Sequence, residues 1–254
     1  MKDDLIVGTR IYSFSNSHPK LFQLESWCQD TLKYAAHIVI ATNNQLFNAI
    51  NQIVSVFKDK VSLLLIDPWT EFTHPLNAII VEVNFRGVSK LLLQSFEVYV
   101  SSTDVEKLNS YLTSDTLVVG GKMISNHGGY QPGVQPINGM NSPWNTLALW
   151  NLSKLNVTGF IGISSGLIKD IPGGMEEVST ISLLQQLYPN QAQAKLIALS
   201  DLKWMTHWRC DKRQNHHEQK MMTKLLRAEK QLEYSKIQRL SLIHISEPTR
   251  RSMI

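Results

Sequence analysis

The sequence predicts a single α/β domain in which helices cover a central, mostly parallel sheet. Short apolar runs at residues 5–8, 37–41, 61–66 and 88–93 are the candidate strands. They show almost no alternation of polar and apolar residues, which is typical of strands buried on both faces. Segments with helical spacing of apolar residues separate them, at residues 18–36, 45–57 and 75–86. This β-α-β-α-β-α-β order favours parallel strands joined by right-handed crossovers.

The second half of the chain is less regular. A Gly-, Pro- and Asn-rich loop at residues 125–142 is long enough to suggest a functional flap. Apolar segments follow it at residues 147–150 and 159–162. We also expect a helix at 104–112, a strand at 116–120, a strand at 195–198 and a long helix at 213–237. A further helix is expected to begin within residues 173–177 and to end at residue 187.

Length and composition fit one globular domain. The 254 residues are 43% hydrophobic and 18% charged, which is ordinary for a folded protein. No apolar run approaches the length that spans a bilayer, and the start of the chain lacks the pattern of a signal peptide. Two cysteines, Cys28 and Cys210, show no metal-binding spacing. We therefore expect a reduced, cytoplasmic location.

The excess of positive charge belongs to one segment of the chain. Residues 1–202 carry 13 Lys or Arg and 16 Asp or Glu, whereas residues 203–239 carry 10 and 4. The net charge of +4 therefore comes from the C-terminal helix and not from the body of the domain. This distribution gives little support to a groove that follows nucleic-acid phosphates, and we expect no nucleic-acid partner.

The last residues of the chain have an unusual pattern. Residues 240–250 resemble an in-frame translation of a transposase adaptor used in sequencing libraries. Segments of that kind are set aside when a fold is predicted. We therefore expect the domain to occupy residues 1–239, and residues 240–254 to form a tail of artificial origin outside it.

Polar residues repeatedly end the candidate strands. Ligands of open α/β sheets bind beyond the carboxyl ends of the strands, so these residues are expected to share one edge. They are Thr9 and Arg10, Thr42 and Asn43, Asp67, and the segment Gln94-Ser95-Phe96-Glu97.

This pattern resembles the GT-A glycosyltransferases of the family 2 kind. The likeness spans roughly residues 5–235 and includes the helix with Asn77 as well as the segments at 139–150 and 176–177. It implies that residues 1–101 bind a nucleotide-sugar and that residues 102–239 shape the acceptor site. It also implies that an acidic metal motif follows the fourth strand, where this chain has Gln94 to Glu97.

The chemistry of a leaving diphosphate explains an acidic motif at this position. Mg²⁺ or Mn²⁺ neutralises the charge that grows on the diphosphate, and such ions prefer carboxylate oxygens. Only Glu97 supplies a carboxylate here, with Ser95 and Gln94 as neutral neighbours. A weaker metal site, a basic side chain such as Arg10 in place of the metal, and a merely solvated Glu97 are the three alternatives.

Transfer to an acceptor hydroxyl also needs a general base. In the family it is an acid on a helix that faces the sugar, a pattern which Glu176 and Glu177 match after Gly173-Gly174. The alternative is that both acids only complement the helix dipole, worth about 0.3–1 kcal/mol.

Trp144 and Asn145 would contact the acceptor if the resemblance holds, because an aromatic face stacks on sugars and an amide reads hydroxyls. A buried Trp with a satisfied indole N–H is the alternative. Asp67 and the Thr42-Asn43 pair could contact the nucleotide, or Asp67 could cap the turn before Pro68.

The leading hypothesis is transfer of a sugar from a nucleotide-sugar to an unidentified acceptor. The alternative is a non-catalytic domain of the same fold that binds a nucleotide or a glycan. A nucleotidyltransferase is a third possibility, disfavoured because no Gly- and Lys-rich phosphate loop follows residues 5–8.

Overall fold

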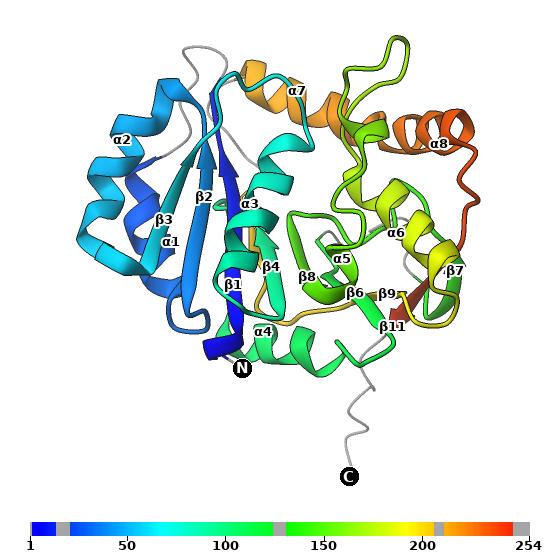
Figure 1. Cartoon of the computed structure of the whole chain (residues 1–254), viewed down its shortest axis with the longest axis horizontal. Helices are drawn as coiled ribbons and strands as arrows, with labels where there is room; N and C mark the ends of the chain where they lie inside the picture. The colour runs from blue at the N-terminus through cyan, green and yellow to red at the C-terminus, as the bar shows by residue number, and fades with distance from the viewer. Residues whose placement is uncertain (1, 14–20, 124–130, 206–210, 246–254) are drawn as a thin grey trace.

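The computed structural model describes residues 2–13, 21–123, 131–205 and 211–245. Its centre is a nine-stranded sheet in the order β3-β2-β1-β4-β8-β6-β9-β11-β7 (Figure 1). The strands are β1 Leu5–Ile11, β2 His37–Thr42, β3 Val61–Leu65, β4 Lys90–Gln94, β6 Thr116–Gly121, β7 Gly133–Pro136, β8 Leu147–Asn151, β9 Gln193–Ile197 and β11 Ser241–Ile245. A two-stranded sheet pairs β5 Val98–Tyr99 with β10 Lys203–Trp204.

Helices lie on both faces of the large sheet. They are α1 Leu24–Thr31, α2 Asn44–Val54, α3 His74–Phe85, α4 Ser102–Ser110, α5 Leu152–Leu155, α6 Glu176–Leu187, α7 Asp211–Met222 and α8 Lys224–Ser235. Single turns of 3₁₀ helix occur at Lys2–Asp4, Leu21–Gln23 and Gly162–Ser164, with a longer one at Ser55–Lys60. None of the helices in these described segments is long and apolar enough to cross a membrane.

The expected α/β fold is confirmed. β1 pairs in parallel with β2 and β4, and β2 pairs in parallel with β3. Side chains alternate between the two faces of β1: Leu5 and Val7 join a core with α1 and α2, whereas Ile6 joins a core with α3. Burial on both faces explains why the strand is apolar without alternation.

The middle of the sheet departs from a purely parallel arrangement. β8 lies between β4 and β6 and is antiparallel to both, and β7 is antiparallel to β11. The apolar pattern of residues 147–150 did not predict whether this segment would pair in parallel or antiparallel with its neighbours. The apolar segment at 159–162 is not a strand. The backbone of Phe160 is hydrogen-bonded to the side chain of Asn77 in α3: Nδ2 donates to Phe160 O at 2.9 Å, and Oδ1 accepts from Phe160 N–H at 2.8 Å.

Residues 241–245 lie inside the sheet, which differs from the expected boundary at residue 239. β11 pairs in parallel with β9 and antiparallel with β7. Leu242 is 0% exposed and His244 is 3% exposed. Buried positions alternate with less buried ones in Ser241–Ile245, which suits a strand. Residues 246–254 lie outside the described segments.

The long helix expected at residues 213–237 is two helices, α7 and α8, separated at Thr223. The hydroxyl of Thr223 donates back to the carbonyl of Gln219 at 2.9 Å. Such back-bonding by a threonine bends helices. The helix expected at 18–36 is shorter too, because α1 covers only Leu24–Thr31. Its first residues, 18–20, and the beginning of the expected flap, 125–130, lie outside the described segments.

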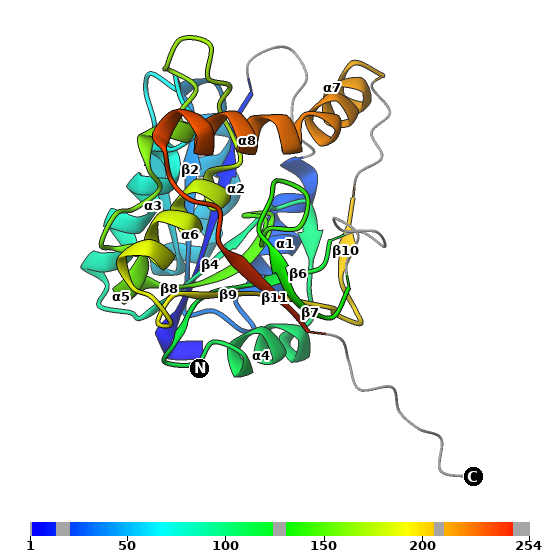
Figure 2. The same cartoon turned by 90° about the vertical axis from the view of Figure 1, so that its right-hand side faces the viewer.

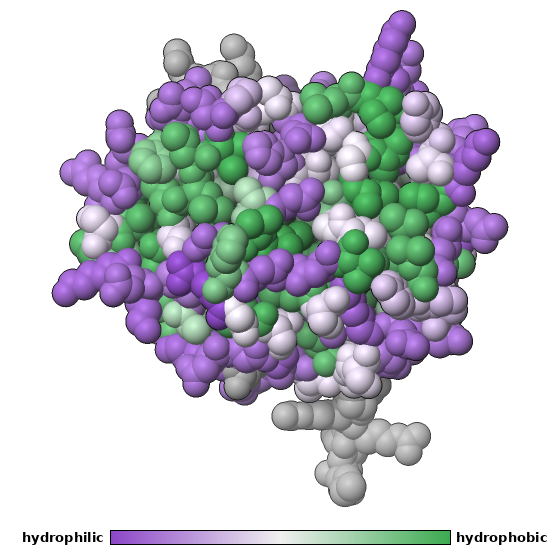
Figure 3. Space-filling model, in the orientation of Figure 1, coloured by the Kyte–Doolittle hydropathy of each residue, from purple (hydrophilic) through white to green (hydrophobic). Residues whose placement is uncertain are grey.

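The α7–α8 pair lies across the edge of the sheet toward which β1 and β2 point, as both views show (Figures 1 and 2). The backbones of α8 and the loop before β8 are in close contact. A Cβ atom at Gly139 would overlap the carbonyl group of Lys224, so this approach requires glycine. On the face that carries α3, apolar side chains reach the surface (Figure 3), where Phe85 is 84% exposed.

Candidate active site at the carboxyl edge of the sheet

A partly buried ion pair joins the two halves of the chain. The guanidinium of Arg10, next to the end of β1, donates through Nη1 to Glu176 Oε1 at 2.8 Å. The same nitrogen donates to the carbonyl oxygen of Phe72 at 2.8 Å. The side chains of Arg10 and Glu176 are 24% and 6% exposed. The pair therefore brings a predicted donor-site residue to the helix that carries the predicted base.

Glu177 is the second buried acid at the start of α6, and the charges of Glu176, Lys224 and Arg10 act on it. Burial raises the pKa of its carboxyl to about 7, and the neighbouring charge of Glu176 acts in the same direction. Lys224 of α8 and Arg10 oppose that rise. A carboxyl with a pKa near neutrality can both accept and release a proton under ordinary conditions.

Lys224 is the counterpart of Glu177. Burial lowers the pKa of its ammonium group to about 7, although the charges of Glu177 and Glu176 act to raise it. Its Nζ lies 2.9 Å from the centre of the Trp144 ring, which is a cation–π contact. Arg227, three residues further along α8, donates through Nη1 to Gly173 O at 3.3 Å, just before α6.

Trp144 lies in the cluster but is only 1% exposed. Its indole N–H donates to Gly139 O at 3.1 Å, and the Trp204 ring packs edge-on at 6.2 Å. Lys224 therefore covers a face of the Trp144 ring, on which an acceptor sugar was expected to stack. Asn145 is half engaged: its Oδ1 accepts from the Trp150 indole N–H at 3.1 Å, whereas its buried Nδ2 has no hydrogen-bond partner among the described residues.

The segment after β4 lies beside the Trp144 turn. The backbone N–H of Ser95 donates to Thr146 O at 2.9 Å, and the Ser95 hydroxyl accepts from Glu97 N–H at 3.3 Å. Glu97 is half-buried and its carbonyl accepts from Met205 N–H at 3.0 Å. In the described parts of the chain, Glu97 belongs to no group of three His, Cys, Asp or Glu side chains that could hold a metal ion.

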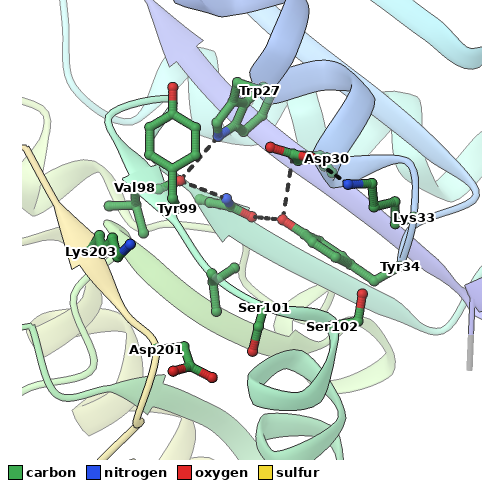
Figure 4. A pocket seen from close by; sticks show the side chains of 13 residues that line it. Trp27, Asp30, Lys33, Tyr34, Val98, Tyr99, Ser101, Ser102, Asp201 and Lys203 are labelled. Carbon is green, nitrogen blue, oxygen red and sulfur yellow. Dashed lines mark hydrogen bonds and ion pairs between the residues drawn. The ribbon is translucent and has the colours of Figure 1, made fainter.

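Gln94 is occupied by other parts of the protein. Its Oε1 accepts from the Tyr34 hydroxyl at 2.8 Å, and its Nε2 donates to Val98 O at 2.9 Å. It borders a cavity of about 290 Å³ between α1, the residues after β4 and the segment of Asp201 and Lys203. Tyr34, Val98 and Asp201 are among the residues that line it (Figure 4). Arg10, Glu176 and Glu177 do not line it.

The polar groups at the other strand ends differ in their burial and in their hydrogen bonding. The hydroxyls of Thr9 and Thr42 are buried and have no hydrogen-bond partner among the described residues. Asn43 donates through Nδ2 to Ser13 O at 2.6 Å, while its Oδ1 has no such partner. Asp67 is exposed after β3 and precedes Pro68 through a cis peptide bond. Asn77 lies apart from these groups, bonded to Phe160.

Some residues of the site were missed in the sequence. Tyr12 and Trp69, which follow β1 and β3, stack with ring centres 4.5 Å apart and an angle of 26° between the planes. Their places just beyond strand ends could have marked them. Lys224 and Arg227 gave no such signal, because on a helix with an apolar stripe they look like ordinary solvated charges.

Comparisons with known proteins leave the family open. No protein-family model matches the chain, and no curated protein matches it. Residues 1–349 of S. aureus TarS share 15% identity at a TM-score of 0.48, over 79% of this chain. The chain spans 58% of that TarS fragment.

Two further solved structures resemble the chain over most of its length. A 4-diphosphocytidyl-2C-methyl-D-erythritol synthase from Anaerococcus prevotii shares 9% identity at a TM-score of 0.47, with 85% of this chain and 96% of that chain covered. A putative glucose-1-phosphate thymidylyltransferase from Bacillus anthracis shares 7% identity at a TM-score of 0.49, with 84% of this chain and 94% of that chain covered. Similarity at this level assigns neither a family nor an activity to this chain.

Proposed function

We propose that the chain is a GT-A-like glycosyltransferase, similar to family 2, which transfers a sugar from a nucleotide-sugar to an acceptor hydroxyl at the Arg10–Glu176–Glu177 cluster. The observation that carries the proposal is the 2.8 Å ion pair between Arg10 and Glu176. It joins the end of β1, where such sheets bind ligands, to the helix that presents a buried acid with a raised pKa. Buried titratable groups with shifted pKa values mark candidate active sites.

Glu177 is the better general base of the two acids. The Glu176 carboxylate is already occupied by Arg10, which donates to its Oε1 at 2.8 Å. Glu177 has no such short ion pair among the described residues, and burial raises its pKa to about 7. In the proposed reaction its carboxylate takes the acceptor hydroxyl proton. The acceptor oxygen then bonds to the anomeric carbon as the bond from that carbon to the diphosphate breaks.

The donor would lie along the ends of β1, β2 and β3. The buried Thr9 and Thr42 hydroxyls and Asn43 Oδ1 have no hydrogen-bond partners among the described residues, and polar atoms of this kind call for an explanation such as a ligand. The stacked Tyr12 and Trp69 rings offer a surface for a nucleobase. Asp67 is accessible to the same ligand. The proposal does not depend on Gln94 or Asn77, whose side-chain amides are already bonded within the protein.

A divalent ion is a separate part of the proposal. Divalent ions such as Mg²⁺ need several oxygen ligands. Glu97 and Ser95 supply too few to hold such an ion when no donor is bound. These two residues fit only an ion that is shared with the phosphates of a bound donor. When bound, Mg²⁺ or Mn²⁺ would neutralise charge on the leaving diphosphate.

A binding domain without transferase activity is the second candidate. The specific observation in its favour is the burial of Trp144 under Lys224, which leaves the predicted acceptor surface covered. Such a domain would bind the nucleotide and release it unchanged.

A thermal-shift screen of the full chain separates these candidates. The full chain is needed because β11 lies within the sheet. UDP-, GDP- and related sugars are tested with Mn²⁺ and with EDTA, since a ligand that binds only the folded state raises the melting temperature. The proposal expects stabilisation by one nucleotide class, and a larger shift with Mn²⁺ that Glu97→Gln removes. If no nucleotide shifts the melting temperature, both candidates are wrong.

A further inference from the structure

The cluster of two buried acids and three half-buried cations contains more positive than negative groups. Arg10, Lys224 and Arg227 face two acids, Glu176 and Glu177, and each cation is electrostatically coupled to at least one of them. With every group ionised the cluster has a net charge of +1. Since a buried unpaired charge is costly, this arrangement favours the arrival of an anion.

Lys224 has unused hydrogen-bonding capacity. Its ammonium lies 2.9 Å from the centre of the Trp144 ring, a contact that satisfies none of its three N–H donors. No hydrogen-bond acceptor within the described segments is bonded to Nζ. The Glu177 carboxylate influences the ammonium only through space. A half-buried ammonium in this position can therefore donate to a ligand.

Arg227 provides a second set of donors on the same helix. It lies three residues after Lys224, and residues at that spacing are neighbours on a helix surface. Its Nη2 donates to Lys220 O at 2.7 Å, yet its buried Nε has no hydrogen-bond partner within the described segments. Two neighbouring cations of α8 thus have N–H groups without acceptors.

These cations lie close to the expected leaving group of the donor. The backbone of Ser95, after β4, is hydrogen-bonded to Thr146 in the turn that presents the Trp144 ring to Lys224. Arg10 at the end of β1 reaches the same acids. The cluster therefore borders the strand ends where the diphosphate is placed by the proposed function.

We propose that Lys224, supported by Arg227 and Arg10, binds the diphosphate of the nucleotide-sugar and neutralises the charge on it as it departs. This assignment rests on the proposed function and deepens it. Two or three ammonium N–H groups donate to phosphate oxygens, so α8 serves as part of the site and not only as its cover. An ammonium binds phosphate as a point charge.

Inorganic pyrophosphate is the probe that tests this assignment. Calorimetric titration of the full chain at pH 6.5 in EDTA measures its affinity, with uridine and UDP titrated in parallel. Lys224→Met is expected to weaken pyrophosphate and UDP by roughly 10- to 100-fold, the loss expected when hydrogen bonds to a charged group are removed. Uridine affinity is expected to be unchanged. Lys224→Arg keeps the charge and is expected to restore part of the affinity.

Lys230→Met is the matched control, because Lys230 is an exposed lysine of α8. Pyrophosphate affinity in the wild type is also expected to fall from pH 6 to pH 8.5. Lys224 loses its proton over this range and Glu177 becomes negative, while the guanidinium groups of Arg10 and Arg227 stay charged. Glu176, which pairs with Arg10, and Lys220 are the other charged groups that act on Lys224.

The outcomes are separable. Equal pyrophosphate affinity in wild type and Lys224→Met overturns the assignment, even if UDP binds. Failure of the wild type to bind any nucleotide contradicts the proposed function. If Lys224→Met does not fold, as judged by circular dichroism, Arg227→Gln and the wild-type pH series decide: pyrophosphate affinity that is unchanged in both overturns the assignment.

Discussion

At the scale of single residues, the chemistry of the site depends on Glu177 and on the groups that share its surroundings. Two acids at the start of α6 would ordinarily complement the helix dipole and remain ionised. Here burial outweighs the dipole for Glu177 and raises its pKa to about 7. Glu176 is compensated by Arg10 at 2.8 Å. The two neighbouring carboxyls therefore have different roles because their partners differ.

Glu177→Gln is expected to abolish sugar transfer in a variant that still binds the donor. The amide keeps the shape of the side chain but cannot accept a proton, and general-base catalysis contributes roughly 10²–10⁴-fold. Single-turnover transfer and nucleotide titration check the two effects separately. Weakened donor binding with unchanged turnover would show that Glu177 is a binding residue instead.

The same substitution should change the titration of Lys224. The charge of Glu177 raises the pKa of this ammonium against the effect of burial, so Glu177→Gln should lower that pKa below about 7. Lys224 then loses its proton at a lower pH than in the wild type. NMR of ¹⁵N-labelled lysine side chains follows this titration, and an unchanged midpoint would mean that the two groups do not interact.

Arg10→Met is expected to destabilise the fold by about 3 kcal/mol, because it leaves the buried Glu176 without its counter-ion. The double variant Arg10→Met with Glu176→Gln should recover much of this loss, since the buried charge is gone as well. Urea denaturation measures both changes in the free energy of unfolding. If the losses of stability in Arg10→Met and in Glu176→Gln simply add in the double variant, the two side chains are not energetically coupled.

At the scale of elements, the position of α8 determines whether the site exists. The side-chain amide of Gln231 donates through Nε2 to Pro172 O and Gly174 O, both at 2.7 Å, and so ties α8 to the loop before α6. Gly139 permits contact between backbones on the other side. None of these contacts has a local sequence pattern, which is why the amphipathic stripe predicted the helix but not its partners.

Gly139→Ala should displace α8 and weaken the cluster. The added methyl group would overlap the Lys224 carbonyl, and overpacking of this kind costs about 1–3 kcal/mol. Gly162→Ala is the control, because a Cβ there meets nothing within 4 Å. Thermal melts and pyrophosphate titration should show a loss for the first variant only. Equal behaviour of the two variants would contradict the close contact.

β11 gives a second test at this scale. Deleting residues 240–254 removes the fully buried Leu242 and leaves one side of β9 unpaired. Amide hydrogen exchange in Lys195 to Ile197 should then become faster, because their strand partner is gone. Unchanged protection would show that the segment contributes nothing to the sheet, as the resemblance to an adaptor sequence implies.

At the scale of the whole molecule, the first half of the fold was predictable because its signals are local. Apolar runs without alternation and intervening helical periodicity identified β1 to β4 and α1 to α3. β8 between β4 and β6, and β11 beside β9, depend on pairing between distant segments, which periodicity does not report. The site divides in the same way: Arg10 and Glu176 were found from element ends, whereas Lys224 enters from a helix more than 200 residues away from β1.

Hydrogen exchange of the full chain, measured with and without its tightest-binding nucleotide, shows where the donor binds. A donor bound at the carboxyl edge should slow exchange in residues 9–13, in residues 42–44 and at the start of α6, where its groups lie next to Arg10 and Glu176. Protection confined instead to the cavity beside Tyr34 and Lys203, or absent everywhere at saturating nucleotide, would contradict the proposed site.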